Sequence, residues 1–170
     1  IAHNVGPKSG NRIYCHCDDC QSFAKYLGRE NILDENKGTD IFQMSYTDME
    51  ITEGVEYLKS IRLTEKGLIR WYADCCKTPV GNTISGKMPF VGVIHTFMND
   101  DGERDENLGP VQGHTFIKKD SPAYHLNTLA IKIVPRMVTR MFVWKLKDSK
   151  KKNPFFDSEG RSVSEPVILN

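Results

Sequence analysis

The stretch C-H-C-D-D-C at residues 15–20 brings together three of the five cysteines of this 170-residue chain, spaced C-x-C-x-x-C. Three sulfurs at this spacing can converge on one ion only if the backbone curls around it, and Asp18 and Asp19 suit such a turn. Buried thiols that bind nothing are the alternative, because free cysteine is a common core residue. Core cysteines have no reason to gather beside two aspartates, so the stretch predicts a zinc site.

Zinc in proteins takes thiolate and imidazole ligands in tetrahedral geometry, with four protein ligands in structural sites and three in catalytic ones. The metal ligands that we expect from this turn are Cys15, Cys17 and Cys20, which is the count of an open, catalytic site. Candidates for a fourth ligand are Cys75, Cys76, His16 and His95.

The histidines are weaker candidates than the cysteines. Both neighbours of His16 coordinate the ion in this scheme, so its side chain should point away. His95 lies among apolar residues and is more typical of a core histidine than of a ligand or an acid–base group. His114 follows Gly113 and is a candidate for a lid residue.

Composition limits the other possibilities. Lys and Arg number 23 and Asp and Glu 22, so the chain lacks the concentrated positive charge that nucleic-acid binding requires. The lysine run at 150–152 is short and typical of a solvated tail. No apolar run approaches the roughly 20 residues of a membrane span, and the first residues lack a signal peptide's apolar core, so we expect neither a nucleic-acid nor a membrane partner and a cytoplasmic location. Five cysteines, two of them adjacent, form a poor disulfide framework.

Short strand-like segments with turn residues between them predict a mainly β, antiparallel core in a single domain over residues 1–170. The predicted strands are 12–14, 41–45, 49–52, 57–64, 68–73, 80–84 and 90–98. The charged, Gly-rich segment 99–112 predicts an exposed loop, with a mobile lid as the alternative.

Helical spacing predicts a short helix over 21–27, a further turn near 30–34 and a C-terminal helix over 136–147. We expect the C-terminal helix to bury one side and to expose the other. The side expected to be buried carries Met137, Val138, Met141, Phe142 and Leu146, and the exposed side Arg136, Arg140, Lys145 and Lys147. The tail 148–170 contains Phe155 and Phe156, which predict that it packs back onto the body.

The segment C-H-C-D-D-C-Q-S-F, followed downstream by C-K-T-P-V-G-N, resembles the glutathione-dependent formaldehyde-activating enzyme (GFA) family. That family carries a C-H-C-x-x-C-R/K motif, then strands, then C-x-x-C-G-T-P. The tail N-P-F-F-D is similar to an uncharacterised bacterial branch of these proteins. The resemblance covers residues 11–98 by motif order and the remainder more loosely.

The resemblance implies a β-tent zinc fold with short helices. It implies that Cys15, Cys17 and Cys20 form the functional zinc site, which meets the thiol of glutathione, and that Cys76 belongs to a structural zinc site. The implied activity is the addition of glutathione to formaldehyde, giving S-hydroxymethylglutathione, which is classed as carbon–sulfur lyase chemistry.

The chain departs from the family pattern at three points. Ala73 stands where the partner of Cys76 is expected, and Cys75 is the candidate substitute. The family's earlier C-x-C pair, which completes the structural site, is absent from this chain. Either the sequence starts after that pair, as a first residue of Ile rather than Met suggests, or the structural site is lost. Gln21 replaces the usual basic residue after the third cysteine, which bears on the substrate.

Three functions fit this pattern. The first is a zinc-dependent carbon–sulfur lyase acting on a small thiol adduct of the glutathione type, in which the metal holds the thiol as thiolate beside an electrophilic carbon. The second is a structural zinc domain that acts as a protein-interaction module. The third, ranked last, is a redox protein whose cysteines cycle to disulfide.

Overall fold

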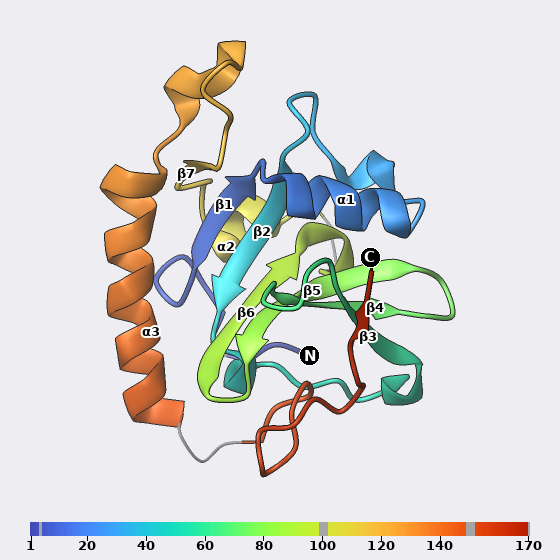
Figure 1. Ribbon diagram of the computed structural model, residues 1–170. Helices are drawn as coiled ribbons and strands as arrows, with labels where there is room; N and C mark the ends of the chain where they lie inside the picture. Colours follow the sequence, from blue (N-terminus) through green and yellow to red (C-terminus); the bar gives the residue numbers. More distant parts are fainter. Residues whose placement is uncertain (4, 99–101, 149–151, 170) are drawn as a thin grey trace.

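The computed structural model describes all residues except 4, 99–101, 149–151 and 170. Within these residues the strands form one eight-stranded sheet of order β7-β1-β2-β6-β5-β4-β3-β8 (Figure 1). The strands are β1 (Asn11–Cys15), β2 (Thr39–Met44), β3 (Leu58–Arg62), β4 (Ile69–Ala73), β5 (Thr78–Ser85), β6 (Met88–Ile94), β7 (Gly113–Thr115) and β8 (Val167–Ile168). The prediction of a mainly β chain with short helices and a C-terminal helix is confirmed.

The sheet is mixed, so the prediction of a purely antiparallel sheet is wrong at its edges. The five pairings among β1 to β6 are antiparallel, as alternating short strands predict. Strand β7 pairs with β1 in parallel, and β8 pairs with β3 in parallel. Both edge strands follow a long connection that carries the chain back to the starting end of its partner, which parallel pairing requires.

Most predicted strands are present, with one exception. The segment 49–52 forms no strand, because the chain turns through a short 3-10 helix immediately before it and Met49 ends that helix. Two of the longer predicted strands lose one end to a short helical turn, 57–64 at its start and 90–98 at its end, and further short turns lie between the strands. These turns are η1 (Glu30–Ile32), η2 (Tyr46–Asp48), η3 (Val55–Tyr57), η4 (His95–Phe97), η5 (Pro122–Leu126) and the π-helical turn η6 (Leu129–Ile133).

The alternation of side chains along the strands divides the core into two clusters, one on each face of the sheet. One cluster surrounds Trp71 and includes Phe42 and Val91. The other contains Cys15 and Cys20 together with apolar residues of β1, β2 and β6. The cysteine stretch therefore lies on a defined face of the sheet.

Helix α1 (Asp18–Tyr26) packs on the face with the cysteines and buries Phe23 and Ala24 against the sheet. It begins three residues before the predicted helix, because Cys17 caps it and the two aspartates favour the positive end of the helix dipole. It ends before Gly28, whose φ of +64° suits glycine.

Helix α3 (Val134–Asp148) lies at the opposite edge of the same face (Figure 1). The side that it turns to the sheet is only partly the predicted one, since Met137 and Met141 are half-buried. Val138, Phe142 and Leu146 are 59%, 65% and 69% exposed, whereas Trp144 is buried. The prediction that these three residues pack into the core is wrong.

The reason for this rotation is a buried acceptor on β1. The Nε atoms of Arg136 and Arg140 both donate to the Oδ1 atom of Asn11, whose side chain is fully buried. An amide oxygen in the interior needs donors, and the two arginines supply them. The helix therefore turns its arginine side inward.

The segment 99–112 contains helix α2 (Arg104–Leu108), while 99–101 lie outside the described residues. Leu108 is buried in the cluster around Trp71, on the face opposite the cysteines. The described part of this segment therefore does not cover the cysteine stretch, as a lid would.

The tail after α3 packs back onto the sheet. The ring centroids of Trp71 and Phe155 lie 5.0 Å apart, and those of Trp71 and Phe156 lie 6.0 Å apart. Strand β8 then extends the sheet beyond β3. Among the described residues, no helix has both the length and the apolar character needed to cross a membrane.

Candidate metal centre

Three sulfur atoms converge where β1 ends and α1 begins. Cys15 is the last residue of β1, Cys17 caps α1, and Cys20 lies in the first turn of that helix. The Sγ atom of Cys15 lies 3.4 Å from that of Cys17 and 3.6 Å from that of Cys20. The strand end and the helix start thus form the turn that the sequence predicts.

This donor set fits a zinc ion. All three sulfurs lie within 4.8 Å of one another, and Cys15 and Cys20 are buried. Tetrahedral zinc with Zn–S bonds of about 2.3 Å sets its sulfurs roughly 3.8 Å apart. Cys15, Cys17 and Cys20 can therefore hold a metal ion with little movement.

The three thiols do not have equal acidity. Hydrogen bonds from Cys15 and Cys20 lower the pKa of the Cys17 thiol, which also accepts the backbone N–H of Cys20 at 3.4 Å. Hydrogen bonding within the cluster, followed by burial, raises the pKa of Cys20 well above its usual value. One thiolate forms readily, but three together in a buried site require a cation.

Arg70 on β4 supplies a positive charge at this site. Its Nη1 atom lies 3.8 Å from the Sγ atom of Cys20, and its Nη2 atom lies 3.2 Å from the Oδ2 atom of Asp19. The guanidinium carbon lies 5.7 Å from the ring centroid of Phe23. Arg70 is only 1% exposed, so its charge acts on the sulfurs with little screening by water.

Arg70 is not among the site residues predicted from the sequence. The signal was present, because Arg70 alternates with the apolar residues Ile69 and Trp71 in a strand that is buried on both faces. A charged residue at a core position is costly unless it is paired. It therefore marks a polar partner on that face.

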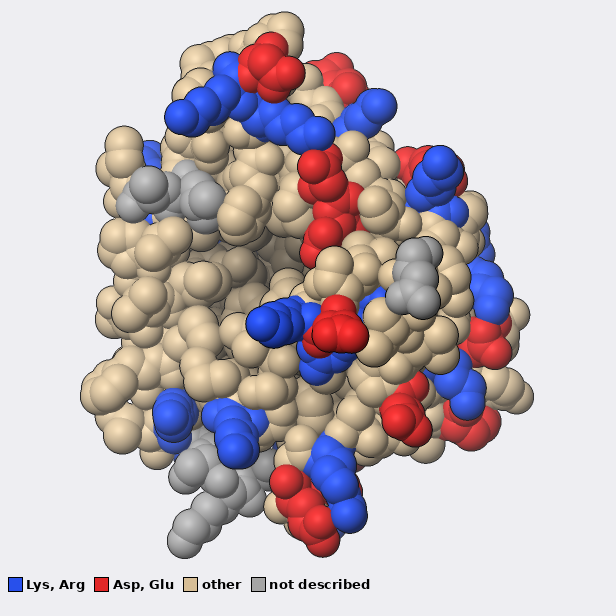
Figure 2. Space-filling view, in the orientation of Figure 1, with Lys and Arg blue, Asp and Glu red and all other residues tan. Residues whose placement is uncertain are grey.

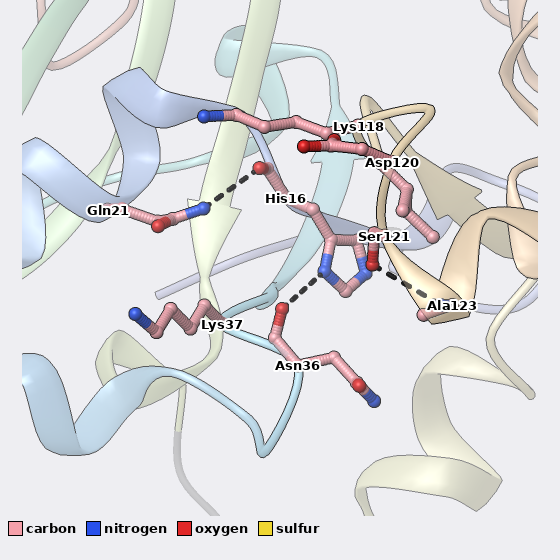
Figure 3. A pocket seen from close by; sticks show the side chains of 9 residues that line it. His16, Gln21, Asn36, Lys37, Lys118, Asp120, Ser121 and Ala123 are labelled. Atoms are coloured by element: carbon pink, nitrogen blue, oxygen red, sulfur yellow. Dashed lines mark hydrogen bonds between the residues drawn. The ribbon is translucent and has the colours of Figure 1, made fainter.

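His16 points away from the sulfurs, as the sequence predicts. Its ring lies between Asn36 and the segment that carries Ser121, in a pocket of about 260 Å³ (Figure 3). Its Nδ1 atom lies 3.1 Å from the carbonyl oxygen of Asn36, and its Nε2 atom lies 3.0 Å from the Nδ1 atom of His114.

These contacts assign the protons of both rings when they are neutral. The carbonyl of Asn36 can only accept, so the Nδ1 atom of His16 carries a proton and its Nε2 atom accepts from His114. Burial, followed by the neighbouring His16, lowers the pKa of His114. The ring of His114 also stacks on Tyr14. The pair joins β1 to β7.

Gln21, at the position of the family's basic residue, donates its Nε2 hydrogen to the backbone carbonyl of His16 at 3.0 Å (Figure 3). It fixes the turn between the strand and the helix. It places no charge near the sulfurs.

The remaining candidate ligands lie elsewhere. His95 stands at the start of η4, half-buried, with its Nδ1 atom 3.3 Å from the carbonyl oxygen of Asp40, and burial lowers its pKa. Cys75 and Cys76 are exposed in the turn between β4 and β5, where the Sγ atom of Cys76 donates a hydrogen bond to the Oγ1 atom of Thr78. Among the described residues, Cys15, Cys17 and Cys20 form the only group of three or more ligand side chains in reach of one ion. A second zinc site at Cys75 and Cys76 stays a prediction.

Comparison with known proteins gives one match. The model of a family described as "Family of unknown function (DUF6151)" matches residues 2–166, which is nearly the whole chain, so the chain belongs to this family. No curated protein and no solved structure matched the chain.

Proposed function

For this member of a family of unknown function, we propose that Cys15, Cys17 and Cys20 hold a zinc ion and that the protein is a zinc-dependent carbon–sulfur lyase acting on a small thiol adduct of the glutathione type. The convergence of three sulfurs, two of them buried, carries the proposal. No fourth His, Cys, Asp or Glu joins that group among the described residues, and a three-ligand set is the one that catalytic zinc sites use.

The resemblance of the cysteine motif to the GFA family supports the choice of substrate and of zinc. It also supports describing the fold as β-tent-like, with the metal held where a strand meets a helix. The mixed sheet and the position of the cysteines at the end of β1 are compatible with that description.

A bound zinc ion would act as a Lewis acid that lowers the pKa of a coordinated thiol and keeps it as a thiolate. The protein's own residues prepare the site. Three cysteine thiolates and a divalent ion carry a net charge of about −1, and the guanidinium of Arg70 beside Cys20 balances it. Asp19 holds that guanidinium in place.

The coordination of zinc tests the proposal. X-ray absorption of the zinc-loaded protein should show three sulfur ligands and one lighter atom, and a fourth sulfur should replace the lighter atom when glutathione is added. The Cys76→Ser variant, whose changed residue is exposed, is the matched control. Four protein sulfurs before any thiol is added would favour the structural zinc module instead.

Turnover tests the reaction itself. We expect the zinc-loaded protein to accelerate the formation of S-hydroxymethylglutathione from formaldehyde and glutathione, followed by proton NMR. An unchanged rate, together with glutathione binding at the metal, would retain the thiol site and reject formaldehyde as the partner carbon.

A further inference from the structure

A row of polar residues crosses the middle of the sheet on the face that carries the cysteines. The strand register places five residues opposite one another on five successive strands. In order from β1 to β4 they are Asn11, Gln43, Gly92, Asn82 and Arg70. Directly opposed residues turn their side chains to the same face, and Arg70 reaches Cys20, so this face is the one beneath α1 and α3.

These side chains are almost fully buried. Asn11 is 0% exposed, Asn82 is 4% and Gln43 is 7%. Buried amides normally form hydrogen bonds with both their oxygen and their nitrogen. Tracing the hydrogen bonds along the row therefore shows which amide groups have no partner.

The α3 end of the row fixes the orientation of two amides. Arginine can only donate, so the Asn11 atom that receives Arg136 and Arg140 must be the oxygen. The Nδ2 atom of Asn11 then donates to the Oε1 atom of Gln43 at 3.3 Å. The Nε2 group of Gln43 remains as a donor.

The other end of the row fixes the third amide in the same way. The Nη1 atom of Arg70 donates to the Oδ1 atom of Asn82 at 3.1 Å. The Nδ2 group of Asn82 remains as a donor. Within the part of the chain that the structure describes, neither this group nor the Nε2 group of Gln43 forms a hydrogen bond.

Gly92 separates the two leftover donors and puts no side chain between them. A Cβ atom at this position would come within 2.9 Å of a methyl group of Ile41, so the strand packing itself favours glycine here. The surface is hollowed in front of β2, between α3 and α1 (Figure 2). The centre of the row thus combines two leftover donors with a position that carries no side chain.

We propose that the side-chain NH₂ groups of Gln43 and Asn82, on either side of Gly92, bind the carboxylate of a small acidic molecule. The two NH₂ groups match the two oxygens of one carboxylate. They cannot form a hydrogen bond with each other, because both can only donate. Guanidinium groups at both ends of the row favour negative charge at its centre. This site needs no metal ion. It rests on the proposed function only in one respect: if the zinc chemistry holds, the carboxylate is a second group of the same substrate.

Acetate is the probe, because it carries the carboxylate and nothing else. Two-dimensional ¹H–¹⁵N NMR of the full chain follows the backbone amide of Gly92 and the side-chain amides of Gln43 and Asn82. We expect saturable shifts of these signals, and weaker binding of chloride and inorganic phosphate at the same ionic strength. Amide signals that shift without saturating, or phosphate that binds more tightly than acetate, would overturn the proposal. This test needs only the parent protein.

Two near-isosteric substitutions test the donors. Asn82→Asp and Gln43→Glu keep the oxygen that accepts from Arg70 or Asn11 and replace only the NH₂ group. Each should weaken acetate binding about tenfold or more, the usual effect of losing a hydrogen bond to a charged group. Asn107→Asp, the same chemical change on exposed α2, should bind acetate as the parent does.

The outcome is separable from that of the zinc proposal. The same titration of the metal-free Cys15→Ser variant should show acetate binding, because the row contains none of the zinc ligands. If acetate binds the Asn82→Asp and Gln43→Glu variants as tightly as the parent, the carboxylate site is wrong, whatever the zinc experiments show.

Discussion

The Nη1 atom of Arg70 lies 3.8 Å from the Sγ atom of Cys20, and this contact joins the centre of the sheet to the cysteine turn. The same nitrogen donates a hydrogen bond to the Oδ1 atom of Asn82, so one buried guanidinium contacts both the cysteine cluster and the polar row. The coulombic effect of Cys20 keeps the pKa of Arg70 raised, although burial opposes it. The guanidinium of Arg70 is therefore charged at neutral pH.

Replacing Arg70 should weaken metal binding more than it changes the fold. Arg70→Met removes the charge and the hydrogen bond to a thiolate, which predicts a loss of about tenfold to a hundredfold in zinc affinity. Arg70→Lys keeps the charge without the planar fork and should lose less. Competition with a chromophoric zinc chelator measures the zinc affinity of both variants. Arg62→Met on neighbouring β3 is the control, and equal losses in all three variants would contradict a specific role.

Zinc content should depend on three cysteines and not on the other two. Cys15→Ser, Cys17→Ser and Cys20→Ser should each lose most of their zinc, because the remaining two sulfurs cannot replace the binding energy of the third. Cys75→Ser and Cys76→Ser, exposed in a turn, should keep about one ion per chain. Metal analysis after native purification measures the zinc content of each variant. Unchanged zinc in the first three variants would refute the metal centre.

The sequence predicts those parts of the structure that depend on local patterns. The spacing of Cys15, Cys17 and Cys20 is a local feature, and a turn that brings them together needs only the strand end and the helix cap. The alternation of Ile69, Arg70 and Trp71 predicts a strand because the side-chain period is intrinsic to extended backbone. Both predictions are independent of which strand lies next to which.

What the sequence could not show depends on register. Gln43 and Asn82 lie 39 positions apart in the chain and stand on either side of Gly92 only because β2, β6 and β5 pair in one register. A shift by one residue would turn each of them to the other face. The parallel pairing of β8 depends likewise on where the chain returns after α3, which no local pattern encodes.

The direction of α3 is the clearest case, and a pair of substitutions tests it. Apolar spacing alone placed Phe142 in the core, but the hydrogen bonds to Asn11 turn the helix so that Trp144 is buried instead. Trp144→Ala should lower the free energy of unfolding by about 3–5 kcal/mol. Phe142→Ala, at an exposed position, should change it by no more than about 0.5 kcal/mol. Urea unfolding measures the loss of stability in each variant. A larger loss in Phe142→Ala than in Trp144→Ala would mean that the side of α3 predicted from the sequence faces the core.

A buried ion pair on the opposite face should also be important for stability. The Nη2 atom of Arg12 lies 2.8 Å from the Oδ2 atom of Asp40 across β1 and β2, and both side chains are buried. Asp40→Asn removes the buried partner of the guanidinium and leaves only the exposed Asp105 beside it, so it should cost about 3–5 kcal/mol. Asp105, which also contacts Arg12, is 85% exposed, so Asp105→Asn should leave the unfolding midpoint close to that of the parent. Equal effects of the two substitutions in thermal unfolding would mean that Asp40 has no special role.

The C-terminal tail should be part of the cooperative core. Phe155 is fully buried against Trp71, which lies at the centre of the sheet, so Phe155→Ala opens a cavity there and should cost about 3–5 kcal/mol. The near-ultraviolet circular dichroism of the folded variant should also change, because that signal reports the surroundings of Trp71. Val163→Ala, half-exposed in the same tail, is the control and should leave both stability and spectrum near those of the parent. If Phe155→Ala unfolds at the parent's urea midpoint with an unaltered spectrum, the tail contributes nothing to the core, and the contact between Phe155 and Trp71 is wrong.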